Sequence, residues 1–176
     1  MSENMINDTN QYLTFKLGEE VFALDITKVR EVLEYTAVTK VPQTPAFMRG
    51  VINLRGGVVP VVDMRLKFGM EVTANTVNTC IIISEINIDE EITILGALAD
   101  SVQEVIELEP AQIEPAPRMG TRLKTEFIKG MGKRDGEFII ILDIDKVFSL
   151  EDVESLQGTG PVMPNQEVFM DQRVAN

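Results

Sequence analysis

The chain repeats one of its own segments. Residues 47–64 read FMRGVINLRGGVVPVVDM and residues 127–144 read FIKGMGKRDGEFIIILDI, and the two align without a gap at an offset of 80 residues, from Phe47 to Phe127. The identical pairs are Phe47 and Phe127, Gly50 and Gly130, Gly56 and Gly136, and Asp63 and Asp143. An internal period constrains the architecture before any residue has a role, because both copies should form the same local structure.

The repeat extends in both directions from this block. Upstream, VREVLE at 29–34 matches VQEVIE at 102–107, and downstream Phe68 matches Phe148. Each unit of roughly 75 residues is too small to be strongly stable alone. We therefore expect one domain at 11–157, with a first barrel at about 11–72, a second at about 76–148, possible exchange of strands or helices between them, and flexible tails at 1–10 and 158–176.

Short apolar runs with turn residues between them predict a mainly β chain. The expected strands are Tyr12–Leu17, Val21–Leu24, Met48–Leu54, Val58–Val62, Thr79–Ile86, Ile92–Ala99, Phe127–Gly132 and Phe138–Leu142. Short helices are expected at Asp25–Leu33, Met64–Phe68 and Asp100–Ile106, because an aspartate that suits an N-cap stands at or just before the start of each, and an acidic helix is expected at Ser149–Gln157. The first would bury a stripe formed by Ile26, Val29, Val32 and Leu33. Asp100 and Gln103 fit a capping box. Two small antiparallel barrels packed together would remove the exposed edges of such short sheets.

The composition excludes several classes of function. With 28 acidic and 16 basic residues the net charge is −12, which disfavours nucleic acid and anionic membranes as partners. The chain has no histidine and one cysteine, so the usual zinc ligand sets and the commonest general base are missing. It also has no phosphate-binding glycine motif. We expect no cofactor, no metal and a cytoplasmic protein, since no signal peptide or membrane-spanning run is present.

Two repeat-related aspartates are the strongest enzymatic alternative. A pair formed by Asp63 and Asp143 could share a proton, as in one class of protease. The residues that follow them are Met64-Arg65 and Ile144-Asp145, whereas that class requires small hydroxyl and glycine residues. Helix capping is the favoured interpretation of both aspartates, and no catalytic residue is expected.

Three segments in order carry a family resemblance: ALDITKVREV, TPAFMRGVINLRGGVVPVVDMRLKF and AQIEPAP. Over about residues 11–157 the chain resembles the CheW-like chemotaxis coupling proteins. The resemblance implies two intertwined five-stranded β-barrels and a non-enzymatic adaptor. It would couple the cytoplasmic tips of methyl-accepting chemoreceptors to the regulatory domain of the chemotaxis histidine kinase. A CheW-like module of another sensory pathway remains the alternative.

The resemblance also assigns residues. Its receptor-facing positions fall on Val29, Glu31, Val32, Gly50 and Arg55, with Val105 on the opposite wall of a groove between the barrels. Its contacts with the kinase and with CheW-like paralogues in rings fall on Arg49, Glu114, Arg118 and Met119. Glu31 and Arg55 are expected to pair within the adaptor, which would be cytoplasmic and recruited to membrane-associated receptor arrays. The family is also named for purine binding, but these residues indicate no nucleotide site.

Overall fold

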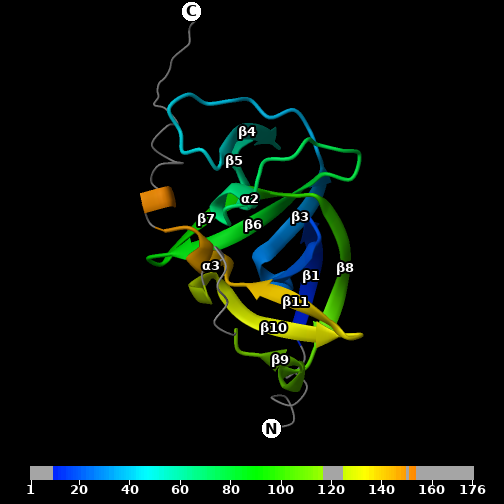
Figure 1. Cartoon of the computed structure of the whole chain (residues 1–176). Helices are drawn as coiled ribbons and strands as arrows, with labels where there is room; N and C mark the ends of the chain where they lie inside the picture. The colour runs from blue at the N-terminus through cyan, green and yellow to red at the C-terminus, as the bar shows by residue number, and fades with distance from the viewer. Residues whose placement is uncertain (1–9, 117–124, 150, 154–176) are drawn as a thin grey trace, which may run out of the picture.

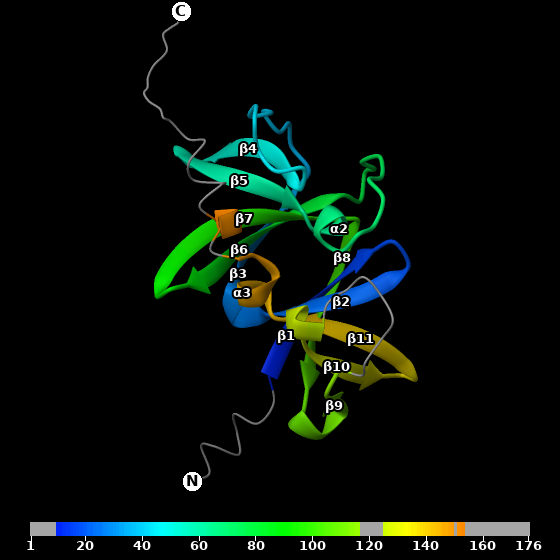
Figure 2. The same ribbon diagram turned by 60° about the vertical axis from the view of Figure 1, so that its left-hand side comes forward.

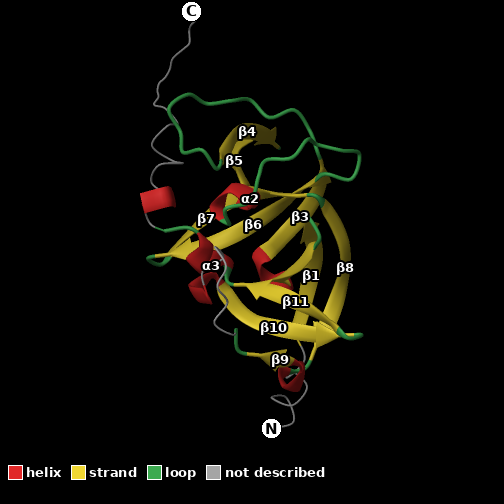
Figure 3. Cartoon of the chain, viewed as in Figure 1, coloured by secondary structure: helices red, strands yellow, loops and turns green. Residues whose placement is uncertain are grey.

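The computed structural model describes residues 10–116, 125–149 and 151–153, and folds them into two curled sheets (Figures 1 and 3). The six-stranded sheet has the order β8 (Ser101–Leu108), β1 (Asn10–Leu17), β2 (Glu20–Asp25), β11 (Glu137–Leu142), β10 (Ile128–Arg134) and β9 (Ile113–Glu114). The five-stranded sheet has the order β3 (Val29–Glu34), β6 (Cys80–Ile88), β7 (Glu91–Ala99), β5 (Gly57–Asp63) and β4 (Met48–Leu54). The mainly β fold is confirmed.

Each sheet contains strands from both halves of the chain. The first hairpin, β1–β2, pairs with β8 and β11, whereas the equivalent hairpin of the second half, β6–β7, pairs with β3 and β5. The β2–β11 and β5–β7 pairings are parallel and the others are antiparallel. The expectation of wholly antiparallel barrels is wrong at these two pairings, because there a hairpin of one half enters beside a strand of the other.

The strands bury side chains on both faces, which explains their apolar runs. On β6, Ile81 and Ile83 pack with Val59 and Val61 in a cluster within the five-stranded sheet. Ile82, which points the other way, joins a larger cluster that includes residues of both sheets. A third cluster lies within the six-stranded sheet. Each sheet therefore has its own apolar interior, and a shared core holds the two sheets together. Figure 2 shows the two curled sheets from a second side.

Four phenylalanines in the shared core explain part of the repeat. The ring centroids of Phe47 and Phe148 are 5.7 Å apart, and those of Phe68 and Phe127 are 6.0 Å apart. These two contacts are equivalent under the repeat, since each joins the start of one copy to the end of the other. The ammonium of Lys67 lies over three of the rings, at 5.1 Å from the Phe47 centroid.

The helix predicted at Met64–Phe68 with Asp63 as its cap is confirmed, but those predicted at Asp25–Leu33 and Asp100–Ile106 are wrong over most of their length. In place of a helix to Leu33, a 3₁₀ turn spans Ile26–Lys28 and β3 follows. In place of a helix from Asp100, β8 begins at Ser101, and no capping box forms between Asp100 and Gln103. The spacing of apolar and charged residues in VREVLE is compatible with a helix or with a strand. The segment is a strand because β3 pairs with β6.

The helices of the described residues are short. They are α2 (Met64–Lys67), α3 (Ile144–Val147) and a helical segment at 151–153, with 3₁₀ turns η1 (Ile26–Lys28), η2 (Pro110–Gln112) and η3 (Thr125–Phe127). Asp63 caps α2 by accepting a hydrogen bond from the backbone N–H of Arg65, whereas Asp143, at the N-cap of α3, makes no such bond. Within the described ranges, no helix has the length and apolar character needed to cross a bilayer.

Candidate binding surface

The turn between β4 and β5 places Arg55 at the tip of a hairpin. Arg55 and Gly56 have φ values of 53° and 85°, and their repeat equivalents Asp135 and Gly136 have 54° and 80°. Two successive positive φ values define the type I′ turn that suits a two-residue hairpin. The repeat therefore fixes the backbone of both tips, but an arginine occupies one and an aspartate the other.

Arg55 reaches from this tip to Glu31 on β3. Its Nη1 and Nη2 donate to Glu31 Oε2 and Oε1 at 2.5 and 2.9 Å, which confirms the predicted pair as a bidentate one. Because β3 and β4 are the two edges of the five-stranded sheet, this contact also shows how far the sheet curls. The Arg55 side chain is 70% exposed, so the pair stabilises the fold little. Its main effect is to hold the guanidinium over β3.

The hydrogen bond from Arg55 lowers the pKa of Glu31 below its ordinary value, and the same bond raises the pKa of Arg55. Since the folded pKa of Glu31 is the lower one, the pair contributes above the unfolded pKa and is lost as pH falls through the folded value. We expect a carboxyl NMR titration to show this depressed midpoint. Arg55→Gln should raise the Glu31 pKa toward the ordinary value of a glutamate, because the hydrogen bond that lowers it is lost.

Arg30→Gln is the matched control for this titration, because Arg30 lies on the same strand but donates to Glu85 at 2.6 Å. It should leave the Glu31 midpoint unchanged. Equal midpoints in the parent and the Arg55→Gln variant would show that the pair does not persist in solution.

The other predicted receptor-facing residues differ in exposure. Val32 on β3 is 39% exposed and Val105 on β8 is 47% exposed, although both are apolar. They are equivalent under the repeat, and each lies on an edge strand of its sheet. Val29 is half-buried against the shared core, and Gly50 is buried. Glu31 lies opposite Ile83 and Val32 lies opposite Ile82, so the Glu31–Arg55 pair and the exposed Val32 side chain lie on opposite faces of the edge strand β3.

Gly50 has a structural reason to be glycine. Its φ is +144°, and a Cβ added there would lie 2.1 Å from the carbonyl oxygen of Thr39. Thr39 and Val51 exchange backbone hydrogen bonds of 2.9 and 2.8 Å, which bring this segment onto β4. Gly50 therefore permits a close approach of two backbones next to the hairpin that carries Arg55.

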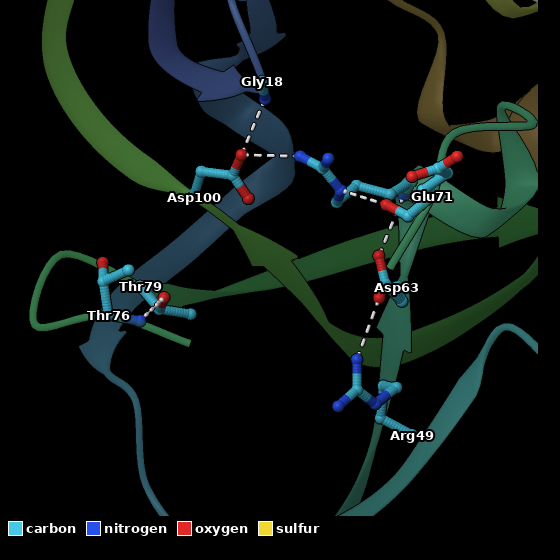
Figure 4. Close-up of polar contacts among 8 residues, drawn as sticks. Gly18, Arg49, Asp63, Glu71, Thr76, Thr79 and Asp100 are labelled. Atoms are coloured by element: carbon cyan, nitrogen blue, oxygen red, sulfur yellow. Dashed lines mark hydrogen bonds and ion pairs between the residues drawn. The ribbon is translucent and has the colours of Figure 1, made fainter. Parts of the chain in front are cut away.

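Arg49 and Glu114, predicted to face the kinase or the ring, lie in different sheets. The Arg49 Nη1 donates to Oδ2 of the buried Asp63 at 3.0 Å (Figure 4). Its charge is therefore partly used inside the protein. Glu114 is exposed on β9, where it pairs with Met131. The predicted Arg118 and Met119 lie outside the described residues.

The contacts of Asp63 do not resemble those of a catalytic dyad. One carboxylate oxygen accepts from the Arg65 N–H and the other from Arg49. Asp63 ends β5 in one sheet and Asp143 follows β11 in the other. Over the described ranges, no cluster of three or more cysteine, aspartate or glutamate side chains could hold a metal ion.

Two further polar clusters were not predicted from the sequence. Asp100 accepts hydrogen bonds from the Gly18 N–H and from Arg65 (Figure 4). Asp145 accepts from Lys28 and from the Asn87 N–H. Arg65 and Asp145 are equivalent under the repeat, at an offset of 80 residues. The opposite charges of these two equivalent residues are the one feature of the sequence that could have indicated the clusters.

Comparison with known proteins decides the family. Residues 11–152 match the family model described as the CheW-like domain. The chain belongs to the CheW-like family. A chemotaxis protein CheW of Klebsiella aerogenes is 37% identical over 143 residues, covering 81% of this chain and 84% of the relative. A chemotaxis protein CheW of Rhizobium meliloti is 30% identical over 154 residues, covering 88% of this chain and 97% of the relative.

A solved CheW structure has the same fold. The crystal structure of the scaffolding protein TtCheW from Thermoanaerobacter tengcongensis superposes with a TM-score of 0.72 at 36% identity. The match covers 81% of this chain and 90% of that one. The CheW-like fold expected from the sequence is therefore confirmed over most of the chain.

Proposed function

We propose that this protein is a chemotaxis adaptor that couples the cytoplasmic tips of chemoreceptors to the regulatory domain of a histidine kinase. Membership of the CheW-like family over residues 11–152 carries the proposal, since the relatives are chemotaxis proteins and one is a scaffolding protein. The adaptor acts by binding and performs no chemistry of its own. It works in the cytoplasm and is recruited to membrane-associated receptor arrays.

The receptor surface is assigned to the face around the Glu31–Arg55 pair. The exposed edge strand β3 supports this assignment, because it offers the apolar Val32 on one face and the charged Glu31–Arg55 pair on the other, next to each other in the chain. Val29 and Gly50 shape the strands beneath, and Val105 contributes from the second half. Arg49, Glu114, Arg118 and Met119 are assigned to contacts with the kinase and with paralogues in rings.

The test is reconstitution of the purified protein with receptor-containing membranes and the histidine kinase of the same cell. Kinase autophosphorylation should become receptor-dependent only when the adaptor is present, and affinity capture from that cell should recover both partners. Capture of a histidine kinase and receptors that serve surface motility or gene control would instead favour a CheW-like module of another pathway. Turnover of a substrate by the protein alone would contradict the adaptor function.

A further inference from the structure

Two ionic clusters, here called clamps, join the inserted hairpins to the rest of the fold. In the first, Lys28 Nζ lies 2.7 Å from Asp145 Oδ2, and Asp145 Oδ1 accepts the Asn87 N–H at 2.7 Å. In the second, Arg65 Nη1 lies 2.7 Å from Asp100 Oδ2, which also accepts the Gly18 N–H at 2.6 Å (Figure 4).

The two clamps lie at corresponding places of the repeat and have reversed charges, although the corner residues Lys28 and Asp100 are one position out of register at the offset of 73. In each clamp one charge lies at the corner, meaning the bend of the chain directly after the hairpin β1–β2 or β6–β7. The other charge lies at the second residue of a short helix, α3 or α2. In the first clamp the corner supplies the cation, Lys28, and the helix supplies the acid, Asp145. In the second the corner supplies the acid, Asp100, and the helix supplies the cation, Arg65.

The backbone pairing of the sheets does not by itself determine which hairpin goes where. Strand β2 meets β11 with Ala23 opposite Ile141, and β7 meets β5 with Gly96 opposite Val61. These pairs correspond under the repeat offsets of 73 and 80 residues that join VREVLE to VQEVIE and Phe47 to Phe127. The hydrogen-bond ladder would therefore accept an unexchanged arrangement, in which β2 pairs with β5 and β7 with β11.

Charge distinguishes the two arrangements. In the unexchanged arrangement the corner with Lys28 would meet α2 and its Arg65, and the corner with Asp100 would meet α3 and its Asp145. Both contacts would bring like charges together at partly buried positions, where solvent screens them incompletely. The native arrangement places opposite charges at both.

A third ion pair, near the corner with Lys28, does not distinguish the exchanged arrangement from the unexchanged one. Asp25 Oδ2 lies 3.7 Å from Lys129 Nζ, and the repeat equivalent of Lys129 is Arg49. Asp25 would therefore meet a cation in either arrangement. The selectivity resides in the two clamps.

We propose that the reversed charges of the two clamps select the exchanged pairing of hairpins over the unexchanged one. The clamps act as a repulsive element against the wrong arrangement as well as an attraction in the right one, which is how specificity is gained between similar alternatives. A duplicated chain needs such a device, because its two halves retain interchangeable strand registers.

The test compares three full-length variants after refolding from urea. The crossed variant, Arg65→Asp/Asp145→Arg, puts like charges in both native clamps and opposite charges in the unexchanged arrangement. The neutral variant, Arg65→Gln/Asp145→Asn, removes charge without introducing repulsion. The restored variant adds Lys28→Asp and Asp100→Arg to the crossed pair, so that opposite charges return to the native arrangement.

The readouts are the unfolding equilibrium constant, the yield of monomer and the amide NOEs between β2 and either β11 or β5. We expect the crossed variant to lose at least about tenfold in folding equilibrium relative to the neutral variant, or to show β2–β5 NOEs or non-monomeric product. The restored variant should recover monomer with β2–β11 NOEs. Equal stability, yield and β2–β11 NOEs in the crossed and neutral variants would overturn the proposal, as would a restored variant no better than the crossed one.

Discussion

Arg55→Glu is expected to lower receptor-dependent kinase activation by more than about tenfold, a loss of at least about 1.4 kcal/mol in binding. The substitution replaces the donor fork with a carboxylate beside Glu31, which it now repels. The hairpin itself should survive, because its type I′ turn depends on backbone conformation and Gly56, and because Arg55 is exposed. Kinase activation in reconstituted membranes, with circular dichroism and thermal unfolding of the adaptor alone, measures both effects.

Asp135→Lys is the matched control for Arg55→Glu, since it reverses charge at the equivalent tip of the second half. It should leave receptor coupling largely intact. The double variant Glu31→Arg/Arg55→Glu restores an opposite pair: recovered coupling would show that the pair acts by shaping the surface, and continued loss would show that the guanidinium touches the partner. Normal activation by Arg55→Glu at ordinary adaptor concentration would remove Arg55 from the binding surface.

The sequence predicted local structure best where a residue type has one physical reason to be present. Gly56 and Gly136 are examples, because a tight hairpin requires positive φ and both glycines supply it. The positions of the short strands are also predicted to within a few residues, because runs such as Ile81-Ile82-Ile83 are apolar on both faces. The Glu31–Arg55 pair came from the family resemblance and from no periodicity in the chain.

The two wrong helices show where local pattern is insufficient. Ile26, Val29, Val32 and Leu33 match a helical spacing, but in the structure alternate residues of β3 are exposed. Only the presence of β6 beside it settles which period applies, and that contact joins residues about fifty positions apart, such as Val32 and Ile82. Asp100 was misassigned likewise: its hydrogen-bond donors, Gly18 and Arg65, are distant in sequence.

The placement of the hairpins could not be read from the repeat either. Because the two halves share strand registers, the repeat predicts that equivalent elements pair alike but leaves open whether the partner belongs to the same half. The resemblance allowed exchange without requiring it. The sequence shows that the two copies differ in charge at Arg65 and Asp145. This difference can be related to hairpin placement only when the structure shows Asp100 beside Arg65 and Lys28 beside Asp145.

Gly50→Ala is expected to destabilise the protein by about 3 kcal/mol or more, although it adds a single methyl group. The new Cβ would lie 2.1 Å from the Thr39 carbonyl oxygen and 2.7 Å from Val38 Cγ1, at a φ of +144°. Overpacking and strained backbone each cost about 1 to 3 kcal/mol. The backbone at Thr39 must move, and its hydrogen bonds to Val51 would weaken.

Three of the four repeat glycines, changed to alanine one at a time, should show graded losses of unfolding free energy in urea, at unchanged m-value. Gly56→Ala, with φ +85° and no atom within 4 Å of the added Cβ, should cost only about 1 kcal/mol. Gly130→Ala should fall between, because its Cβ would meet the Ile113 Cγ2 at 2.5 Å, a side-chain atom that can move. Equal losses at Gly50 and Gly56 would show that the Thr39 segment is not held against β4. In that case the duplicated glycine at position 50 would have to be explained by what it contacts outside the chain.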